Sequence, residues 1–207
     1  MAKVLDRGTP ACNSGRSMDT DRQFSPDPET RIGDALEAAL EALKLARREL
    51  VATDEEPGRW RWVALGLVSA LQAALVAALS GYATARLEDV ANPSQPNRIA
   101  PVTLLLRRAR SPEHLNPPER LDLTGSQVRA LEALTALRNA AVHGLGFDVP
   151  AAPHAMALAA VDVIRHLLLV HPAFEVSRFV LFLSLIDREL SLLGAALTAL
   201  GGRMSHD

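Results

Sequence analysis

The sequence has a single cysteine, Cys12, so no disulfide can form within the chain. A chain without disulfides suits a reducing compartment, and we therefore expect a cytoplasmic location. Aromatic residues make up only 4% of the chain, and no segment alternates apolar and polar residues as a half-buried strand does. Leucine and alanine are abundant instead, and both favour helices over sheets.

The first 25 residues lack a long apolar run, which argues against a signal peptide. They are polar, contain glycine and show no periodicity, so we expect a disordered tail over residues 1–25. The sequence as a whole is 48% apolar and 22% charged. This composition predicts that residues 26–202 form one helical domain with a hydrophobic core.

The net charge is −2, so the overall balance gives no argument for nucleic-acid binding. The charges are nevertheless unevenly distributed, because residues 27–56 carry nine acidic and four basic side chains, whereas residues 98–138 carry seven arginines against four acids. Such a basic region is compatible with an anionic partner at one face, or with ordinary solvated surface. Arg107, Arg108 and Arg110 are its candidate RNA-binding residues, although no aromatic side chains lie between them for base stacking.

The longest uncharged segment is the 24 residues between Arg61 and Arg86, which is long enough to span a bilayer as a helix. Ser69 and Gln72 interrupt this segment, and alanine supplies many of its other residues. We therefore interpret it as a buried helix of a bundle, with a membrane span as the alternative, and we expect no membrane association.

Capping signals mark the beginnings of two helices. Asp27 precedes Pro28 and an apolar pattern of helical spacing, and Thr124 and Gln127 have the spacing of a capping box. Prolines and Gly144 mark the ends of helices. The expected helices cover about residues 28–53, 59–89, 102–110, 125–143, 154–170 and 174–200.

Proline-rich segments separate these helices. ANPSQPNRIAP at residues 91–101 and SPEHLNPPERLDL at residues 111–123 are expected to be loops. FVLFLSL at residues 179–185 has the composition of a strand, but no partner strand is predicted, so we expect a helix. The sequence therefore predicts an all-α fold, an antiparallel helical bundle of five to six helices without strands.

The segment LRNAAVHG at residues 137–144 places three polar side chains near the end of an apolar helix. On a helical wheel Arg138 lies within the apolar stripe, and Asn139 and His143 share its edge. Arg138 needs a carboxylate, backbone carbonyls, a second subunit or a phosphate, because a buried guanidinium stays charged. Alternatively, Arg138 snorkels from the edge of the stripe and His143 favours the helix dipole. The predicted stripe consists of Val128, Leu131, Leu134 and Val142.

LRNAAVHG resembles the signature of the HEPN superfamily, in which an arginine, often followed by a polar residue such as asparagine, precedes a histidine by four to six residues. WRWVALGLVSALQAALVAAL and the layout of helices around the motif are similar to bacterial HEPN-like proteins over about residues 30–170. The resemblance implies an all-helical bundle, usually a homodimer, whose active members are metal-independent ribonucleases. It also implies a place in a defence or toxin–antitoxin system, with an antitoxin as partner.

The resemblance assigns a role to each polar residue of the motif. Arg138 would bind the scissile phosphate, His143 would act as acid or base, and Asn139 would orient the phosphate or the histidine. RNA cleavage needs one proton removed and another delivered, and a two-fold dimer supplies two histidines. Many HEPN-like domains are thought to be inactive, so a non-catalytic binding or interaction module is the alternative function.

Motifs for other chemistry are missing from the sequence. It contains no GxGxxG, Walker or GxSxG motif. It has no cysteine pair, and His166 and His171 lack a spaced carboxylate cluster. We therefore expect no cofactor and no metal site.

Overall fold

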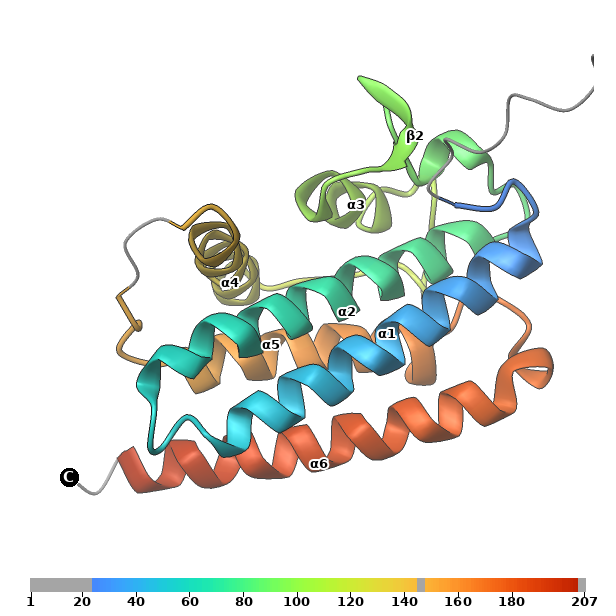
Figure 1. The fold of residues 1–207 in the computed structure, drawn as a ribbon. Helices are drawn as coiled ribbons and strands as arrows, with labels where there is room; N and C mark the ends of the chain where they lie inside the picture. Colours follow the sequence, from blue (N-terminus) through green and yellow to red (C-terminus); the bar gives the residue numbers. More distant parts are fainter. Residues whose placement is uncertain (1–23, 145–147, 205–207) are drawn as a thin grey trace, which may run out of the picture.

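The structure of the chain is a computed structural model, and it describes residues 24–144 and 148–204. Within these residues it contains six α-helices and one two-stranded sheet, which confirms the predicted all-α helical bundle. Figure 1 shows α1 (Pro28–Val51), α2 (Trp60–Gly81), α5 (Pro153–Arg165) and α6 (Val180–Met204) side by side, with α3 (Val102–Ala109), α4 (Gly125–Val142) and the small sheet on one side of them. Phe24 is buried against the core, and the rest of the predicted tail before it lies outside the described residues.

Helix α1 (Pro28–Val51) begins as the sequence predicts. The Asp27 carboxylate accepts a hydrogen bond from the Thr30 N–H at 2.7 Å and so caps the helix. In the first turn, Arg31 is 2% exposed, and its guanidinium donates to the carbonyl of Ser25 at 2.9 Å. This contact holds the residues that precede α1 against the bundle.

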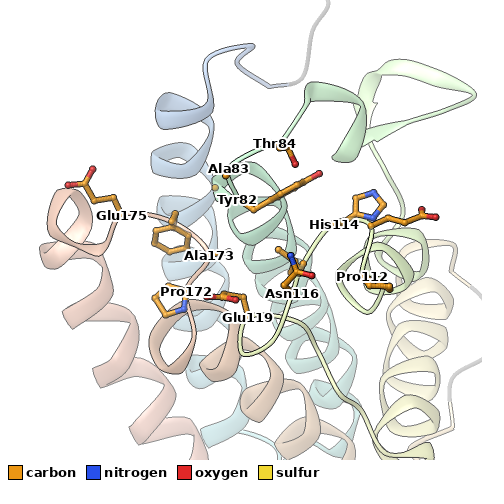
Figure 2. Close-up of a pocket in the computed structure, with 14 residues that line it drawn as sticks. Tyr82, Ala83, Thr84, Pro112, His114, Asn116, Glu119, Pro172, Ala173 and Glu175 are labelled. Atoms are coloured by element: carbon orange, nitrogen blue, oxygen red, sulfur yellow. The ribbon is translucent and has the colours of Figure 1, made fainter.

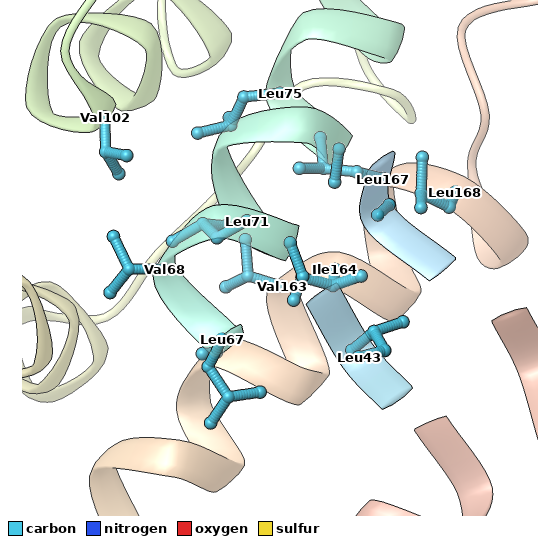
Figure 3. Close-up of a cluster of buried hydrophobic side chains, with 14 of the residues drawn as sticks. Leu43, Leu67, Val68, Leu71, Leu75, Val102, Val163, Ile164, Leu167 and Leu168 are labelled. Atoms are coloured by element: carbon cyan, nitrogen blue, oxygen red, sulfur yellow. The ribbon is translucent and has the colours of Figure 1, made fainter. Parts of the chain in front are cut away.

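Helix α2 (Trp60–Gly81) is the central helix, with 15 of its 22 residues buried. It approaches α1 closely at Gly66, where an added Cβ atom would lie 2.7 Å from the carbonyl oxygen of Ala42. Only glycine fits there without moving the two backbones apart. Figure 3 shows the core around α2, which includes Leu43, Leu67, Val68, Leu71, Leu75, Val102, Val163, Ile164, Leu167 and Leu168.

Helices α3 (Val102–Ala109) and α4 (Gly125–Val142) both pack on α2. The predicted capping box begins α4, because the Thr124 N–H donates to Gln127 Oε1 at 3.0 Å and the Gln127 N–H donates to Thr124 Oγ1 at 3.3 Å. The connection over residues 111–123 contains turns and no helix, as expected from its prolines.

Helix α5 (Pro153–Arg165) continues into a π-helical turn, η3 (His166–Val170). The His171 N–H closes this turn by donating to the carbonyl five residues earlier at 2.9 Å. The chain then reverses into α6 (Val180–Met204), which runs antiparallel to α5 and packs on α1 and α5 (Figure 1). FVLFLSL lies in α6 and the turn before it, so it is helical as predicted.

The prediction that the second helix extends to Asp89 was wrong, because α2 ends at Gly81. A side chain at Gly81 would collide with Phe174 from the distant end of the chain. The next residue, Tyr82, adopts an extended backbone, and its hydroxyl donates to the Asp89 carboxylate at 2.5 Å. The segment therefore folds back through a short 3-10 turn, η2 (Leu87–Asp89).

The prediction of a loop without strands over residues 91–101 was also wrong. Strands β1 (Ala91–Asn92) and β2 (Gln95–Ile99) form an antiparallel hairpin there. Each strand of a two-stranded sheet is an edge strand, so Pro96 can be accommodated with its missing N–H away from the partner strand. Proline content alone therefore does not exclude such a hairpin.

Two described stretches are long and apolar enough to cross a membrane, Pro57–Gly81 and Pro153–Val170. In the first stretch, 78% of the most apolar part is buried inside the bundle. The core helix of a soluble protein has the same length and composition, so these two properties do not identify a membrane span.

Candidate functional site

Helix α4 contacts the bundle through a narrow face. Its buried residues are Leu131, Leu134 and Leu137, and they pack toward α2 and α5. The predicted stripe was partly wrong, because Val142 is 51% exposed. Three leucines at three-residue intervals centre the contact face on Leu134, about 80° from Val142 on a helical wheel. Arg138 lies about 40° from Leu134 on the same wheel, between Leu134 and Leu131, and therefore within this face.

Arg138 is half-buried and has few partners within the described residues. Its Nη1 donates to the side-chain oxygen of Asn139 at 3.0 Å, while its Nε is buried and makes no hydrogen bond. No carboxylate of the described residues forms an ion pair with it. The internal acid that would make Arg138 a structural anchor is therefore not found among the described residues, and the buried Nε remains without a partner.

Asn139 connects the arginine to the histidine. Its side chain accepts from Arg138, and its backbone carbonyl accepts from the His143 N–H at 3.0 Å. His143 is the C-terminal cap of α4 and its side chain is exposed. Gly144 follows with φ of 64°, a left-handed conformation that ends the helix. The structure thus brings the three predicted catalytic residues to one end of α4.

The three side chains do not converge on one point within a single chain. Arg138 and His143 are five residues apart, so they project about 140° apart around the helix. A phosphate bound by Arg138 would therefore lie on a different side of the helix from the His143 side chain of the same chain. An imidazole can lie beside the guanidinium only if a second copy of the chain supplies it or if the two side chains adopt other rotamers.

The three candidate RNA-binding arginines at the end of α3 have different environments. Arg107 and Arg110 are exposed, as a nucleic-acid track requires. The Arg108 guanidinium instead donates to the backbone carbonyls of Asp89 and Ala91, each at 3.0 Å, and burial lowers its pKa. Arg108 therefore holds the hairpin region on α3. Figure 1 shows α3 and α4 on the same side of α2.

A second polar cluster was not anticipated from the sequence. The Asp89 carboxylate accepts from the Tyr82 hydroxyl at 2.5 Å and from the Arg86 N–H at 2.7 Å. His114 Nε2 lies 3.7 Å from the same carboxylate, and His114 Nδ1 is buried without a partner. Burial, followed by the hydrogen bond to Asp89, raises the pKa of Tyr82. The cluster was missed from the sequence because Tyr82, Arg86 and Asp89 were expected to lie on one continuous helix.

The cluster borders a cavity of about 610 Å³ at one end of the bundle. Figure 2 shows Tyr82, His114, Asn116, Glu119 and Pro172 around it. The walls come from three segments far apart in the sequence, so spacing could not reveal the cavity.

Histidines near this cavity form a pair rather than a metal site. The rings of His166 and His171 have centroids 5.1 Å apart, and burial lowers the pKa of His166. Among the residues that the structure describes, no three His, Cys, Asp or Glu side chains are grouped so that they could hold a metal ion.

A comparison with protein-family models, curated proteins and solved structures finds no match for the chain. Any function must therefore be inferred from the residues of the chain itself. The polar residues of the LRNAAVHG motif lie at the end of α4.

Proposed function

We propose that the protein is a cytoplasmic HEPN-type endoribonuclease that cleaves RNA without a metal ion at a site shared by two copies of the chain. The observation that carries the proposal is the state of Arg138. Its guanidinium is half-buried, its Nε is buried without a hydrogen-bond partner, and no carboxylate of the described residues pairs with it. The scissile phosphate of an RNA bound between two copies of the chain would supply the missing anion.

A single Arg138 is a weak phosphate site for an electrostatic reason. It lies near the C-terminal end of α4, where the helix dipole is negative and disfavours anions. Two guanidiniums brought together across a two-fold axis would outweigh this effect and would stabilise the charge that develops on the phosphate. Asn139 would hold each guanidinium in place through the hydrogen bond that it already accepts.

The two histidines would divide the proton transfers of the reaction. One His143 removes the proton of the ribose 2′-hydroxyl, and the 2′-oxygen attacks the phosphorus. His143 of the partner subunit donates a proton to the leaving 5′-oxygen as the P–O5′ bond breaks. The products would be a 2′,3′-cyclic phosphate and a free 5′-hydroxyl. The exposed position of His143 is compatible with access to RNA.

The first test is cleavage of single-stranded RNA by the purified full chain in EDTA. We expect cleavage with a cyclic phosphate product, and a loss of at least about 100-fold in rate for Arg138→Ala and for His143→Ala. Arg129→Ala and Val142→Ala are matched controls, because both residues are exposed on the same helix. Full activity of His143→Ala would exclude the proposed chemistry.

The second candidate function is a non-catalytic interaction module. It is favoured by the 140° separation of Arg138 and His143 around the helix within one chain. In that case purified protein leaves RNA intact under all conditions, and Arg138→Ala weakens self-association without any change in RNA. Measuring the mass of the protein in solution alongside cleavage separates the two functions.

A further inference from the structure

Helix α6 has a second apolar face that the bundle does not cover. Its inward face buries Leu183, Ile186, Leu190, Leu193 and Leu197. On the opposite face, Leu181 is 71% exposed, Leu192 is 44% exposed and Leu185 is 38% exposed. A helix that is apolar on two opposite faces is normally buried on both of them.

The exposed apolar residues follow the spacing of a helix–helix seam. The outward stripe is defined as Leu181, Leu185, Arg188, Leu192, Ala195 and Ala199, all of them exposed. Their separations of four, three, four, three and four residues match the a and d positions of heptads. The stripe covers 19 residues, or roughly 27 Å of helix. Only one of its six side chains is charged.

The order of side chains along the outward stripe fits a second copy of the same stripe in antiparallel orientation. The large Leu181 and Leu185 occupy one end, and the small Ala195 and Ala199 occupy the other. An antiparallel pair places each of these leucines opposite an alanine of the other copy, which fills space evenly. A contact between identical surfaces must be self-complementary in this way.

The charge on the stripe also selects the antiparallel orientation. A parallel pair would place Arg188 directly opposite its own counterpart and would set like charges against each other. In the antiparallel pair, Arg188 lies opposite Leu192 of the other copy, where its aliphatic stem can pack while the guanidinium reaches water. The C-terminal end of the stripe is alanine at positions 195 and 199, and Ser191 and Thr198 flank it, which makes it a poor surface for insertion into lipid.

A groove of about 720 Å³ lies between α1 and Glu189 of α6, beside the outward stripe, and can receive side chains that flank the partner's stripe. Figure 1 shows α4 and α6 on different sides of the bundle, since α4 packs on α2 and α5 while α6 packs on α1 and α5.

We propose that the outward stripe of α6 is a two-fold self-association surface, on which a second copy of the chain packs its own α6 in antiparallel orientation. This surface is separate from the shared site proposed at α4. Two isologous surfaces on different sides of one chain would produce an assembly larger than a dimer, whereas the α6 surface alone would produce a dimer.

The test measures the mass of the full chain against concentration by analytical ultracentrifugation. We expect Leu181→Asp and Leu192→Asp each to weaken one association step by at least about 100-fold, because a carboxylate would be buried in the seam. Val180→Asp is the matched control, since Val180 is 58% exposed on the same helix but about 100° away from the stripe. Arg188→Leu should strengthen the same step about tenfold. Association of both Asp variants equal to that of the control overturns the proposal.

The orientation is tested with a short thiol crosslinker in a Cys12→Ser background. A mixture of Leu185→Cys and Ala195→Cys proteins should crosslink to each other, and neither should crosslink to itself. Crosslinking of Leu185→Cys to itself would indicate a parallel contact and overturn the proposed geometry. Binding of the wild-type chain to vesicles, lost in the Asp variants without any self-association, would also overturn it and assign the stripe to a membrane surface. RNA cleavage is measured on the same variants, and its presence or absence does not affect these outcomes.

Discussion

Helices α2 and α4 have similar lengths but contrasting surroundings. In α2, 15 of 22 residues are buried and neighbouring helices surround it, whereas α4 buries only three of its 18 residues. The polar residues of the LRNAAVHG motif belong to α4, with His143 as its C-terminal cap. Stability and candidate chemistry are therefore placed in different elements, as expected when functional surfaces come from the parts of a fold that open most easily.

The largest effect should come from the core side of this comparison. Leu71 on α2 is fully buried, so Leu71→Ala should lower the free energy of unfolding by about 2–5 kcal/mol. Leu134 on α4 is equally buried, but Leu134→Ala should lower it less, because α4 can open locally while the rest stays folded. Urea unfolding measures both values.

Val51→Ala is the control for these two variants, because Val51 is 76% exposed. It should change the free energy of unfolding by less than about 0.5 kcal/mol. Equal losses for Leu71→Ala and Leu134→Ala would show that α4 unfolds together with the core, and the contrast between the helices would then be wrong.

A smaller effect should appear with pH at the connection between α1 and α2. The hydrogen bond from Arg59 at 2.9 Å holds the pKa of Glu49 below its ordinary value of 4.5. A carboxyl group with a lowered folded-state pKa stabilises the fold above its unfolded pKa, and this stabilisation is lost as the pH falls through the folded pKa. The wild-type urea midpoint should therefore decline below about pH 4.5.

Glu49→Gln should remove part of that decline and lower the midpoint at neutral pH. Glu55→Gln is a suitable comparison, because Glu55 lies nearby and is exposed. An acid decline of the same steepness in Glu49→Gln and in wild type would show that the Arg59 contact does not stabilise the connection between α1 and α2.

The smallest effect should be confined to α4. Thr124→Ala removes the side-chain acceptor of the capping box and should destabilise the helix by about 1 kcal/mol. Hydrogen exchange should become faster in the first turn of α4 and remain unchanged in α2. Thr124→Ser keeps the hydroxyl and should restore most of the protection, whereas a uniform change across the chain would argue against a locally held helix.

The sequence predicted those features of the fold that depend on neighbouring residues. The cap at Asp27 and the capping box at Thr124 are local hydrogen bonds between residues three apart, so their spacing reveals them. The end of α2 depends on Phe174, more than 90 residues later, and no local pattern contains that contact. The hairpin after α2 was missed because its prolines were interpreted only as helix breakers.

The candidate site shows the same division. The position of Arg138 near the apolar face was predictable from helical periodicity, although the exposure of Val142 was not, because the contact face depends on how α4 is tilted on α2 and α5. The structural role of Arg108 depends on carbonyls at Asp89 and Ala91, which the sequence assigned to a helix and a loop. Charge clusters alone therefore could not separate a structural arginine from an available one.

The π-helical turn at the end of α5 places one extra residue just before the cavity wall. An α-helix closes the same turn with one residue fewer, so the extra residue lies between α5 and the segment that supplies Pro172 and Phe174 to the cavity. Deleting one residue from His166–Val170 should therefore convert the turn to ordinary α-helix and leave the residues after it in their present orientation.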